Sequence, residues 1–322
     1  MTAAATAPDP AFPARTGSSH RAVFSVFALS VLIAFAGGVW IYFKYVAYAR
    51  VAARHLPEDT ALAARIDVET VLISQSVRDK LLPLFDQGAP DPQLKPRHDR
   101  FRAHSGVELG RDLREIVFGV QSSGWVVAFG GKFPKTGLVD ELATTLEEEG
   151  TEATLVDGVL EVQSGPAVGQ ARDGALVIAS DVARLRAALA GSDAYLQLGL
   201  PPEGAGGFAL RVRPPIPPGF RDFDRVSGAI TLGETMDVDV AVRLRPGVTA
   251  DPATVASAFA TLGRAAPAAS LAQRPLEHAQ ILPRRPDETS VRLSFQRPEI
   301  DAGAAWLASE LRARFARPRT RP

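Results

Sequence analysis

An uninterrupted apolar stretch near the start of the chain predicts a membrane-spanning helix. Residues Ala22 to Phe43 (AVFSVFALSVLIAFAGGVWIYF) include no charged side chain. About 20 apolar residues allow a helix to cross a ~30 Å hydrocarbon core. Trp40 and Tyr42 near its end are typical of a membrane–water interface. A cleaved signal peptide is the alternative, but its apolar core would be shorter. We therefore expect an uncleaved, single-pass signal anchor.

The segments on either side of this anchor are expected to differ. Residues 1–21 are rich in Pro, Ala and Ser and predict a disordered tail. Residues 44–55 (KYVAYARVAARH) are expected to continue the helix until Leu56-Pro57 stops it. The basic side chains nearest the anchor are almost balanced, so the positive-inside rule leaves the orientation open. They are Arg15 and Arg21 before it, and Lys44, Arg50 and Arg54 after it.

Alternating apolar and polar positions predict a first α+β unit over residues 56–198. Runs of period two indicate strands, and apolar residues three or four positions apart indicate helices. The expected elements are a strand at Ala61–Val68, a hairpin of Glu115–Val120 and Trp125–Phe133, a helix capped by Thr136, a hairpin turning at Asp157-Gly158, a strand at Ala175–Ala179 and a helix capped by Ser180.

A second unit over residues 208–316 follows a joint at 199–207 (GLPPEGAGG). The order of elements in the first unit recurs here, which predicts an internal duplication. Chance similarity between two α+β halves is the alternative. The matching segments are FALRV at Phe208–Val212 with LAARI at Leu62–Ile66, and Arg221-Asp222-Phe223 with Arg111-Asp112-Leu113, 110 residues earlier.

The remaining elements of the second unit complete the predicted fold class. They are strands at Val226–Leu232, Met236–Leu244 and Ser290–Phe295, a helix capped by Asp251, and a final helix carrying Ile300, Leu307 and Phe315. Hairpins in both halves imply antiparallel sheets. The sequence therefore predicts an α+β protein with two similar sheet units, helices packed on one face of each, and a basic tail at 317–322.

Composition excludes several classes of function. The chain has 322 residues, with 36 basic and 36 acidic side chains and no cysteine. The absence of cysteine excludes disulfides, thiolate metal sites and thiol nucleophiles. A nucleic-acid-binding protein usually carries an excess of basic residues, which this chain lacks.

The segment Lys95–His104 (KPRHDRFRAH) contains three side chains that could serve as metal ligands, His98, Asp99 and His104. The two histidines are six positions apart, so they do not share one face of a helix. Neighbouring arginines would also repel a cation. We therefore predict no metal site and interpret the segment as a solvated basic helix.

Paired carboxylates provide no better case for catalysis. Glu58-Asp59 is expected in a loop, and Asp237 and Asp239 on the solvent face of a strand. Neither pair has the apolar surroundings that tune a general acid. Glycine-rich phosphate loops (GxGxxG, GxxxxGK[ST]) are also absent. The sequence therefore assigns no catalytic, cofactor-binding or metal-ligating residue and no cofactor.

Two further groups of residues keep other functions open. The C-terminal arginines could contact anionic lipid head groups or an acidic partner, although a solubilising tail is the simpler interpretation. They are Arg312, Arg314, Arg317, Arg319 and Arg321. An enzyme with dispersed residues could draw on His278, Glu299 and Asp301.

The stretch LPEDTALAARIDV at Leu56–Val68, followed by GVELGRDLREIVFGV at Gly106–Val120, resembles uncharacterised bacterial envelope proteins. Those have one N-terminal anchor and an extracytoplasmic α+β region. The resemblance implies that the soluble region is exported and periplasmic, held at the inner membrane. The resemblance implies no particular function. Because no site is visible and a duplicated sheet offers surfaces and grooves, we expect a non-catalytic scaffold or binding module with a protein partner in the envelope. The alternative is a bitopic component of a secretion or pilus-like machine.

Overall fold

The computed structural model of the chain describes residues 50–75, 77–80, 95–163, 165–213, 220–249, 251–265, 275 and 278–316. The chain divides into two compact units, Met1–Ala49 and Arg50–Pro322, and all described residues belong to the second. The predicted anchor at Ala22–Phe43 and both predicted tails lie outside the described residues. Within the described ranges, no helix has the length and apolar character needed to cross a bilayer.

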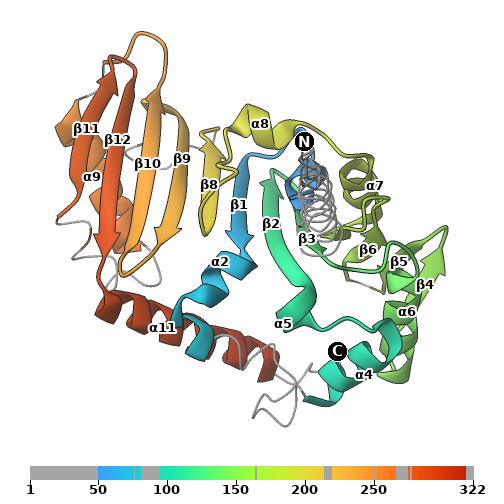
Figure 1. The fold of residues 1–322 in the computed structure, drawn as a ribbon. Helices are drawn as coiled ribbons and strands as arrows, with labels where there is room; N and C mark the ends of the chain where they lie inside the picture. The colour runs from blue at the N-terminus through green and yellow to red at the C-terminus, as the bar shows by residue number, and fades with distance from the viewer. Residues whose placement is uncertain are drawn as a thin grey trace, which may run out of the picture. The chain divides into compact units, whose positions relative to one another are not determined.

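Twelve strands of the described residues form a continuous antiparallel sheet, and helices pack on it (Figure 1). The predicted α+β class is confirmed. The strands, in sheet order, are β11 (Gln280–Arg285), β12 (Glu288–Phe295), β10 (Met236–Leu244), β9 (Phe223–Leu232), β8 (Gly206–Arg211), β1 (Leu62–Asp67), β2 (Leu113–Gln121), β3 (Gly124–Gly131), β7 (Leu176–Ala179), β6 (Ala167–Gln170), β5 (Val159–Val162) and β4 (Ala153–Val156).

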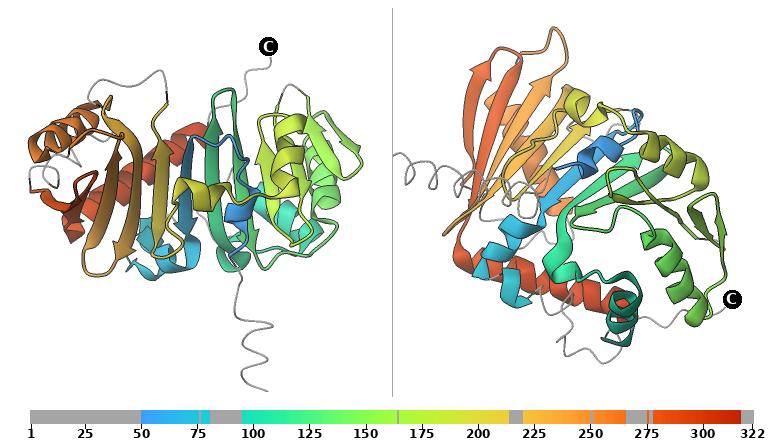
Figure 2. Two further views of the ribbon diagram at one scale, coloured as in Figure 1. Left: turned by 90° about the horizontal axis from the view of Figure 1, so that it is seen from above. Right: turned by 45° about the vertical axis from the view of Figure 1, so that its right-hand side comes forward.

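The helices of the described residues vary widely in length. They are η2 (Ala52–His55), α2 (Val68–Ile73), α4 (Lys95–Ser105), α5 (Leu109–Asp112), α6 (Leu138–Glu148), α7 (Val182–Ala190), α8 (Ala194–Leu198), α9 (Pro252–Ala265) and α11 (Arg297–Ala316). In Figure 2, α9 (orange) and α7 (yellow-green) lie at opposite ends of the sheet.

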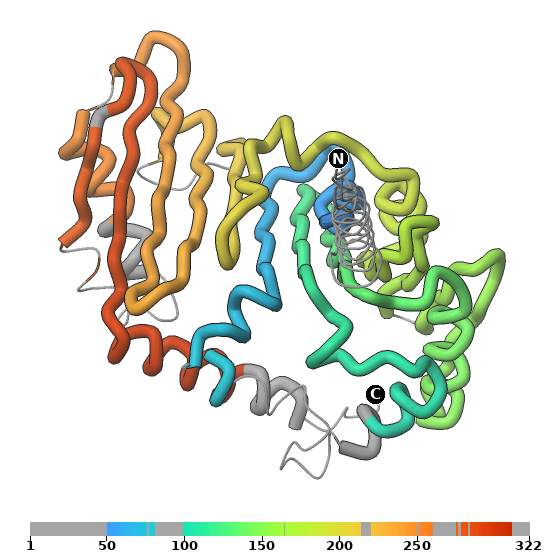
Figure 3. The backbone as a smooth tube through the Cα atoms, viewed as in Figure 1, coloured from blue at the N-terminus to red at the C-terminus, as the bar shows by residue number. Residues whose placement is uncertain are grey.

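Strands from the two predicted units meet at the centre of this sheet. Figure 3 traces β1 between β8 and β2. Strand β1 pairs antiparallel with both neighbours, and Ala64 lies opposite Phe208 of β8 and Phe118 of β2. The two predicted units therefore share one sheet.

The sheet is covered on both faces. Successive residues of a strand point to opposite sides of the sheet, so the two faces can be followed along each strand. On the first face, Ala63, Val117 and Ala209 join a buried core with η2, α7 and α8. On the second face, Phe208 and Val240 belong to the core that includes α9. Each face therefore has its own apolar core.

The prediction that helices cover one face of each unit is wrong for the first unit. Strand β7 buries Val177 and Ala179 against the core that holds α7. Leu176 and Ile178 of the same strand pack in the cluster that holds α6 on the other side. All four residues are apolar, so the strand has no polar face to leave in water.

Two of four predicted helix caps and turns are confirmed. Asp251 caps α9, since its carboxylate accepts hydrogen bonds from the backbone N–H groups of the next turn. Asp157-Gly158 turns the β4–β5 hairpin with positive φ at both residues. Two caps were wrong. Gly137 in the left-handed region, not Thr136, precedes α6, and Asp181, not Ser180, caps α7.

The segment that enters the unit is not the continuous helix predicted over residues 44–55. Its described part is non-helical at Arg50 and Val51 and then forms the short 3-10 helix η2. Ala52 is fully buried, and its backbone N–H donates a hydrogen bond to the Glu115 carboxylate at 3.2 Å. This buried contact draws the segment onto the sheet, which overrides its local helical preference.

Candidate functional site

Four charged side chains meet beside the central strands, and we call Arg50, Arg65, Asp67 and Glu115 the join cluster. Arg65 and Asp67 lie on β1, and Glu115 lies opposite Asp67 on β2. Arg65 and Glu115 are each only 2% exposed. Charges this deeply buried need partners, because desolvating an unpaired ion costs several kcal/mol.

Arg65 connects the two halves of the chain. Its Nε donates to the carbonyl oxygen of Pro201 at 3.0 Å. Its Nη2 donates to the carbonyl oxygens of Glu203 and Gly204 at 2.7 and 3.1 Å. All three acceptors belong to the predicted joint at 199–207. A guanidinium with several fixed donors suits such a row of carbonyl oxygens.

Asp67 and Arg50 attach the segment that begins at Arg50 to the same joint between the two halves. An Arg50 Nη2–Asp67 Oδ2 ion pair of 2.7 Å is supplemented by a hydrogen bond from Arg50 Nη1 to the Pro202 carbonyl at 2.6 Å. The other Asp67 oxygen caps α2 by accepting from the Thr70 N–H at 2.9 Å. One carboxylate thus fixes both the entering segment and the start of a helix.

Glu115 is the electrostatically perturbed member of the cluster. Burial raises the pKa of its carboxyl above the ordinary value, although the Ala52 N–H and the cations Arg65 and Arg50 act in the opposite direction. Its Oε1 has no hydrogen-bond partner among the described residues. A raised carboxyl pKa occurs in general acids. Here, however, neither of the grooves described next includes Glu115.

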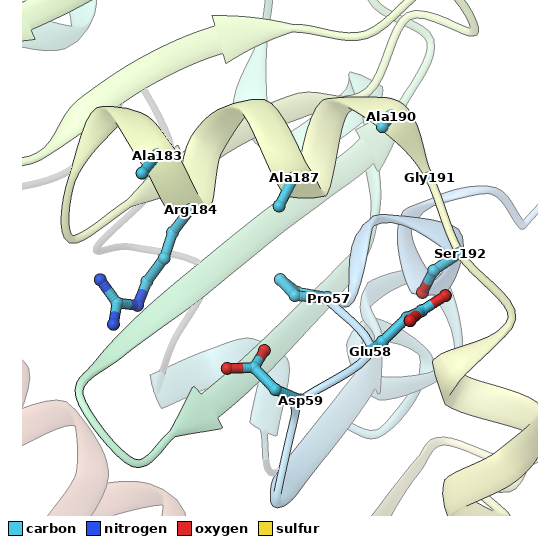
Figure 4. Close-up of a pocket in the computed structure, with 9 residues that line it drawn as sticks. All are labelled: Pro57, Glu58, Asp59, Ala183, Arg184, Ala187, Ala190, Gly191 and Ser192. Carbon is cyan, nitrogen blue, oxygen red and sulfur yellow. The ribbon is translucent and has the colours of Figure 1, made fainter.

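Two open grooves flank α7. The first has a volume of about 580 Å³ and lies between α7 and the loop after η2. Figure 4 shows three alanines of α7 facing Pro57, with Glu58 beside Ser192 at one end. Arg184, at the other end, is paired with Asp181. Small side chains therefore line this groove on the α7 side, and acidic residues line it on the loop side.

The second groove has a volume of about 600 Å³ and is rich in arginine. We call it the arginine groove, since Arg54, Arg172 and Arg186 line it from three separate segments. All three residues are exposed. Their side chains form no ion pair or hydrogen bond with any described residue. Exposed guanidinium groups without such partners are available to bind an anion.

His55 and Asp173 form one wall of the arginine groove. The buried His55 ring lies with Nδ1 2.9 Å from the Ala188 carbonyl oxygen and Nε2 3.1 Å from Asp173 Oδ2. The wall is therefore polar and tied to α7.

The predicted basic helix at Lys95–His104 is not simply solvated. At the end of α6, Arg100 forms an ion pair of 3.1 Å with Glu149, and His104 Nε2 lies 3.2 Å from a carboxylate oxygen of Glu148. Asp99 is exposed, and the side chain of His98 lies outside the described residues. In the described part of the chain, no group of three His, Asp or Glu side chains is arranged to hold a metal ion.

The carboxylate pairs lie where the sequence indicated. Glu58 and Asp59 occupy an exposed turn. Asp239 is in an ion pair of 2.7 Å with Arg292 of β12, and Val238 and Val240 point into the core on the opposite side. These carboxylates are thus at the surface, and Asp239 has a structural partner.

The dispersed residues considered for an enzyme fall in separate settings. His278 lies in an exposed turn before β11. Glu299 and Asp301 lie in the first turns of α11, where the Glu299 carboxylate accepts a hydrogen bond from the Gln296 backbone N–H. The side chains of the C-terminal arginines lie outside the described residues.

Sequence reasoning missed both the join cluster and the arginine groove. Their members lie up to 65 positions apart in the join cluster (50 to 115) and up to 132 positions apart in the arginine groove (54 to 186), and no spacing rule links them. One available signal was the charge of Arg65 and Asp67 in the otherwise apolar strand pattern LAARIDV. A charge on the inward phase of a strand indicates a buried partner.

Comparison with known proteins adds little. No protein-family model and no curated protein matches the chain. Two solved structures, crystal forms III and I of TP0453, are similar to it with TM-scores of 0.46 and 0.44 and sequence identities of 8% and 9%. Each match covers 82% of this chain and 98% of the other. A likeness this distant carries no argument about role.

Proposed function

We propose that the protein is a membrane-anchored, non-catalytic envelope protein that acts as a scaffold or binding module. The join cluster carries this proposal. Arg50 and Ala52, which follow the predicted anchor, are bonded to Asp67, Glu115 and the joint between the halves. The charged side chains of the cluster therefore hold the segment at Arg50–Ala52 to both halves, as a scaffold requires.

We also propose that the two halves arose by internal duplication, and the strand pairing supports this. In each half, the strand before the last helix pairs with two others of the same half. The paired residues recur at a constant interval of 113 positions (127 and 240, 168 and 281, 178 and 291). They are Val127, Val168 and Ile178 in the first half, and Val240, Ile281 and Val291 in the second.

Details around the repeated Arg-Asp pairs agree with the duplication. The Asp112 carbonyl accepts a 2.8 Å hydrogen bond from the N–H of Lys132, just after β3. The Asp222 carbonyl accepts an equal bond from Arg245, just after β10. In both halves the strand pairing shifts register two positions beyond this Asp. Shared bulges are typical of related strands.

Two alternatives remain distinct from the scaffold. A bitopic component of a secretion or pilus-like machine would use the same anchor but pair with further membrane proteins. An enzyme would need residues that converge in a cleft. The two grooves described here contain carboxylates and arginines without a serine–base or metal arrangement among the described residues. This favours binding over catalysis.

The side of the membrane occupied by the unit is the first test. The chain lacks cysteine, so one substitution gives a unique label site. Ser122 is exposed in the β2–β3 turn, and Ser290 is 4% exposed. We would express full-length Ser122→Cys in bacteria and treat intact cells with a membrane-impermeant thiol reagent. Ser290→Cys is the matched control, since a folded unit hides it.

The expected result is that Ser122→Cys reacts in intact cells and Ser290→Cys does not. Reaction of Ser122→Cys only after lysis would place the unit in the cytoplasm and overturn an envelope role. Crosslinking from the same cysteine, followed by purification, then separates a free-standing binder from a machine component. Stable capture of several inner-membrane proteins would favour the machine.

A further inference from the structure

We propose that the arginine groove binds a phosphate-bearing anion, with the head group of an anionic phospholipid as the favoured source. Arg54 of η2, Arg172 of the β6–β7 turn and Arg186 of α7 line a single groove. Guanidinium groups bind phosphate oxygens with two parallel hydrogen bonds. Three such groups around one space of about 600 Å³ can enclose a phosphate.

The contrast with the neighbouring groove shows that this charge is not a general property of the surface. Arg184 belongs to the same helix as Arg186 and lines the other groove, but Asp181 and Ser123 already occupy its guanidinium. In the arginine groove, the carboxylate is Asp173, and its Oδ2 faces His55 at 3.1 Å. The three arginines thus retain net positive charge.

The position of Arg54 in the chain favours a lipid as the source. It lies 11 residues after Phe43, the end of the predicted anchor. Even a fully extended chain of that length spans only roughly 40 Å. Anionic lipid surfaces attract each Lys or Arg that lies within a Debye length of them by about 1 kcal/mol. This choice of source rests on the proposed anchor, whereas phosphate binding by the groove does not.

The test uses the full-length chain in a neutral detergent and measures binding by calorimetry at constant ionic strength. The probes are inorganic phosphate, dihexanoyl phosphatidylglycerol and, as the uncharged comparison, dihexanoyl phosphatidylcholine. The groove variant replaces Arg54, Arg172 and Arg186 with Gln. The control variant replaces Arg221, Arg285 and Arg297, which are exposed and have no ion pair with a described residue, with Gln.

We expect the wild type and the control variant to bind phosphatidylglycerol more tightly than phosphatidylcholine. The groove variant should bind it at least about tenfold more weakly, since three charged contacts are lost. Equal binding of inorganic phosphate would identify a soluble phosphate compound as the source. The proposal is overturned if the wild type binds neither anion, or if both variants bind alike.

A gain of affinity provides a test that misfolding cannot imitate. Asp173→Asn removes the negative charge from the groove but keeps an acceptor for the Ala175 N–H, which Asp173 Oδ1 binds at 3.1 Å. Affinity for the anion should rise about three- to tenfold, as expected for a partly solvated charge. Unchanged or weaker binding would contradict the placement of the anion. Sidedness of Ser122→Cys stays an independent readout of the proposed function.

Discussion

Arginines in two regions of this unit have opposite surroundings. In the join cluster, Arg65 is 2% exposed, and three carbonyl oxygens accept from it. In the arginine groove, Arg54, Arg172 and Arg186 are exposed and unpaired among the described residues. A buried charge is stable only when its partners are fixed. An exposed one stays solvated and can exchange water for a ligand. The comparison indicates a structural role for the first region and a binding role for the second.

The largest effect should come from removing the central cation of the join cluster. Arg65→Ala leaves the carbonyl oxygens of Pro201, Glu203 and Gly204 without their donor. It also removes a buried cation that lies 3.8 Å from Asp67. Breaking a buried ion pair costs about 3–5 kcal/mol. Urea unfolding of the full-length chain should show this loss. Arg211→Ala in the adjacent β8 is the control, since Arg211 has no ion pair with a described residue. Equal losses in both variants would show that Arg65 has no special role.

A smaller loss is expected when only one charge of the cluster is neutralised. Asp67→Asn keeps an oxygen to cap α2 but removes the charge that binds Arg50. Hydrogen bonds to charged groups contribute about 1.5–3 kcal/mol, and the exposure of Arg50 reduces this to about 1–2 kcal/mol. The urea midpoint measures it. Arg50→Gln should give at least this loss, because it also removes the hydrogen bond to the Pro202 carbonyl. The double variant should lose little more than Arg50→Gln, because both substitutions remove the same Arg50–Asp67 pair.

Glu115 should give the cluster a pH dependence. Burial raises its pKa in the folded state, so the folded protein retains a proton that the unfolded chain releases. Stability from this group is therefore complete below the ordinary glutamate pKa and declines as pH rises through the raised folded value. Urea midpoints across a pH series should show the decline in wild type and not in Glu115→Gln. A parallel decline in both proteins would assign it to other groups.

The smallest effect on stability is expected in the arginine groove. Replacing Arg54, Arg172 and Arg186 with Gln breaks no ion pair with a described residue. Surface substitutions of this kind usually change stability by no more than about 0.5 kcal/mol. The urea midpoint should thus stay near that of wild type while anion binding is lost. A loss like that of Arg65→Ala would mean that the groove arginines are structural after all.

The acidic run at the end of α6 illustrates what could not be predicted locally. Glu148 and Glu149 lie at the helix end that disfavours negative charge, so the helix alone gives no reason for them. For the basic helix α4, the sequence predicts only a solvated surface. The two segments pair with each other through Arg100 and His104. Each segment supplies the partners that the other lacks locally, but the paired residues lie 44 to 49 positions apart in the sequence.

The sequence by itself determined the α+β class, most of the strands and several turns, because these depend on short-range periodicity and turn chemistry. Met236–Leu244 and the Asp157-Gly158 turn lie where the pattern placed them. The anchor at Ala22–Phe43 remains a prediction. Tertiary structure alone decided that both halves share one sheet, that β7 is covered on both faces, and that charges gather beside Arg65. Those outcomes depend on partners distant in sequence, and local pattern does not encode which distant groups meet.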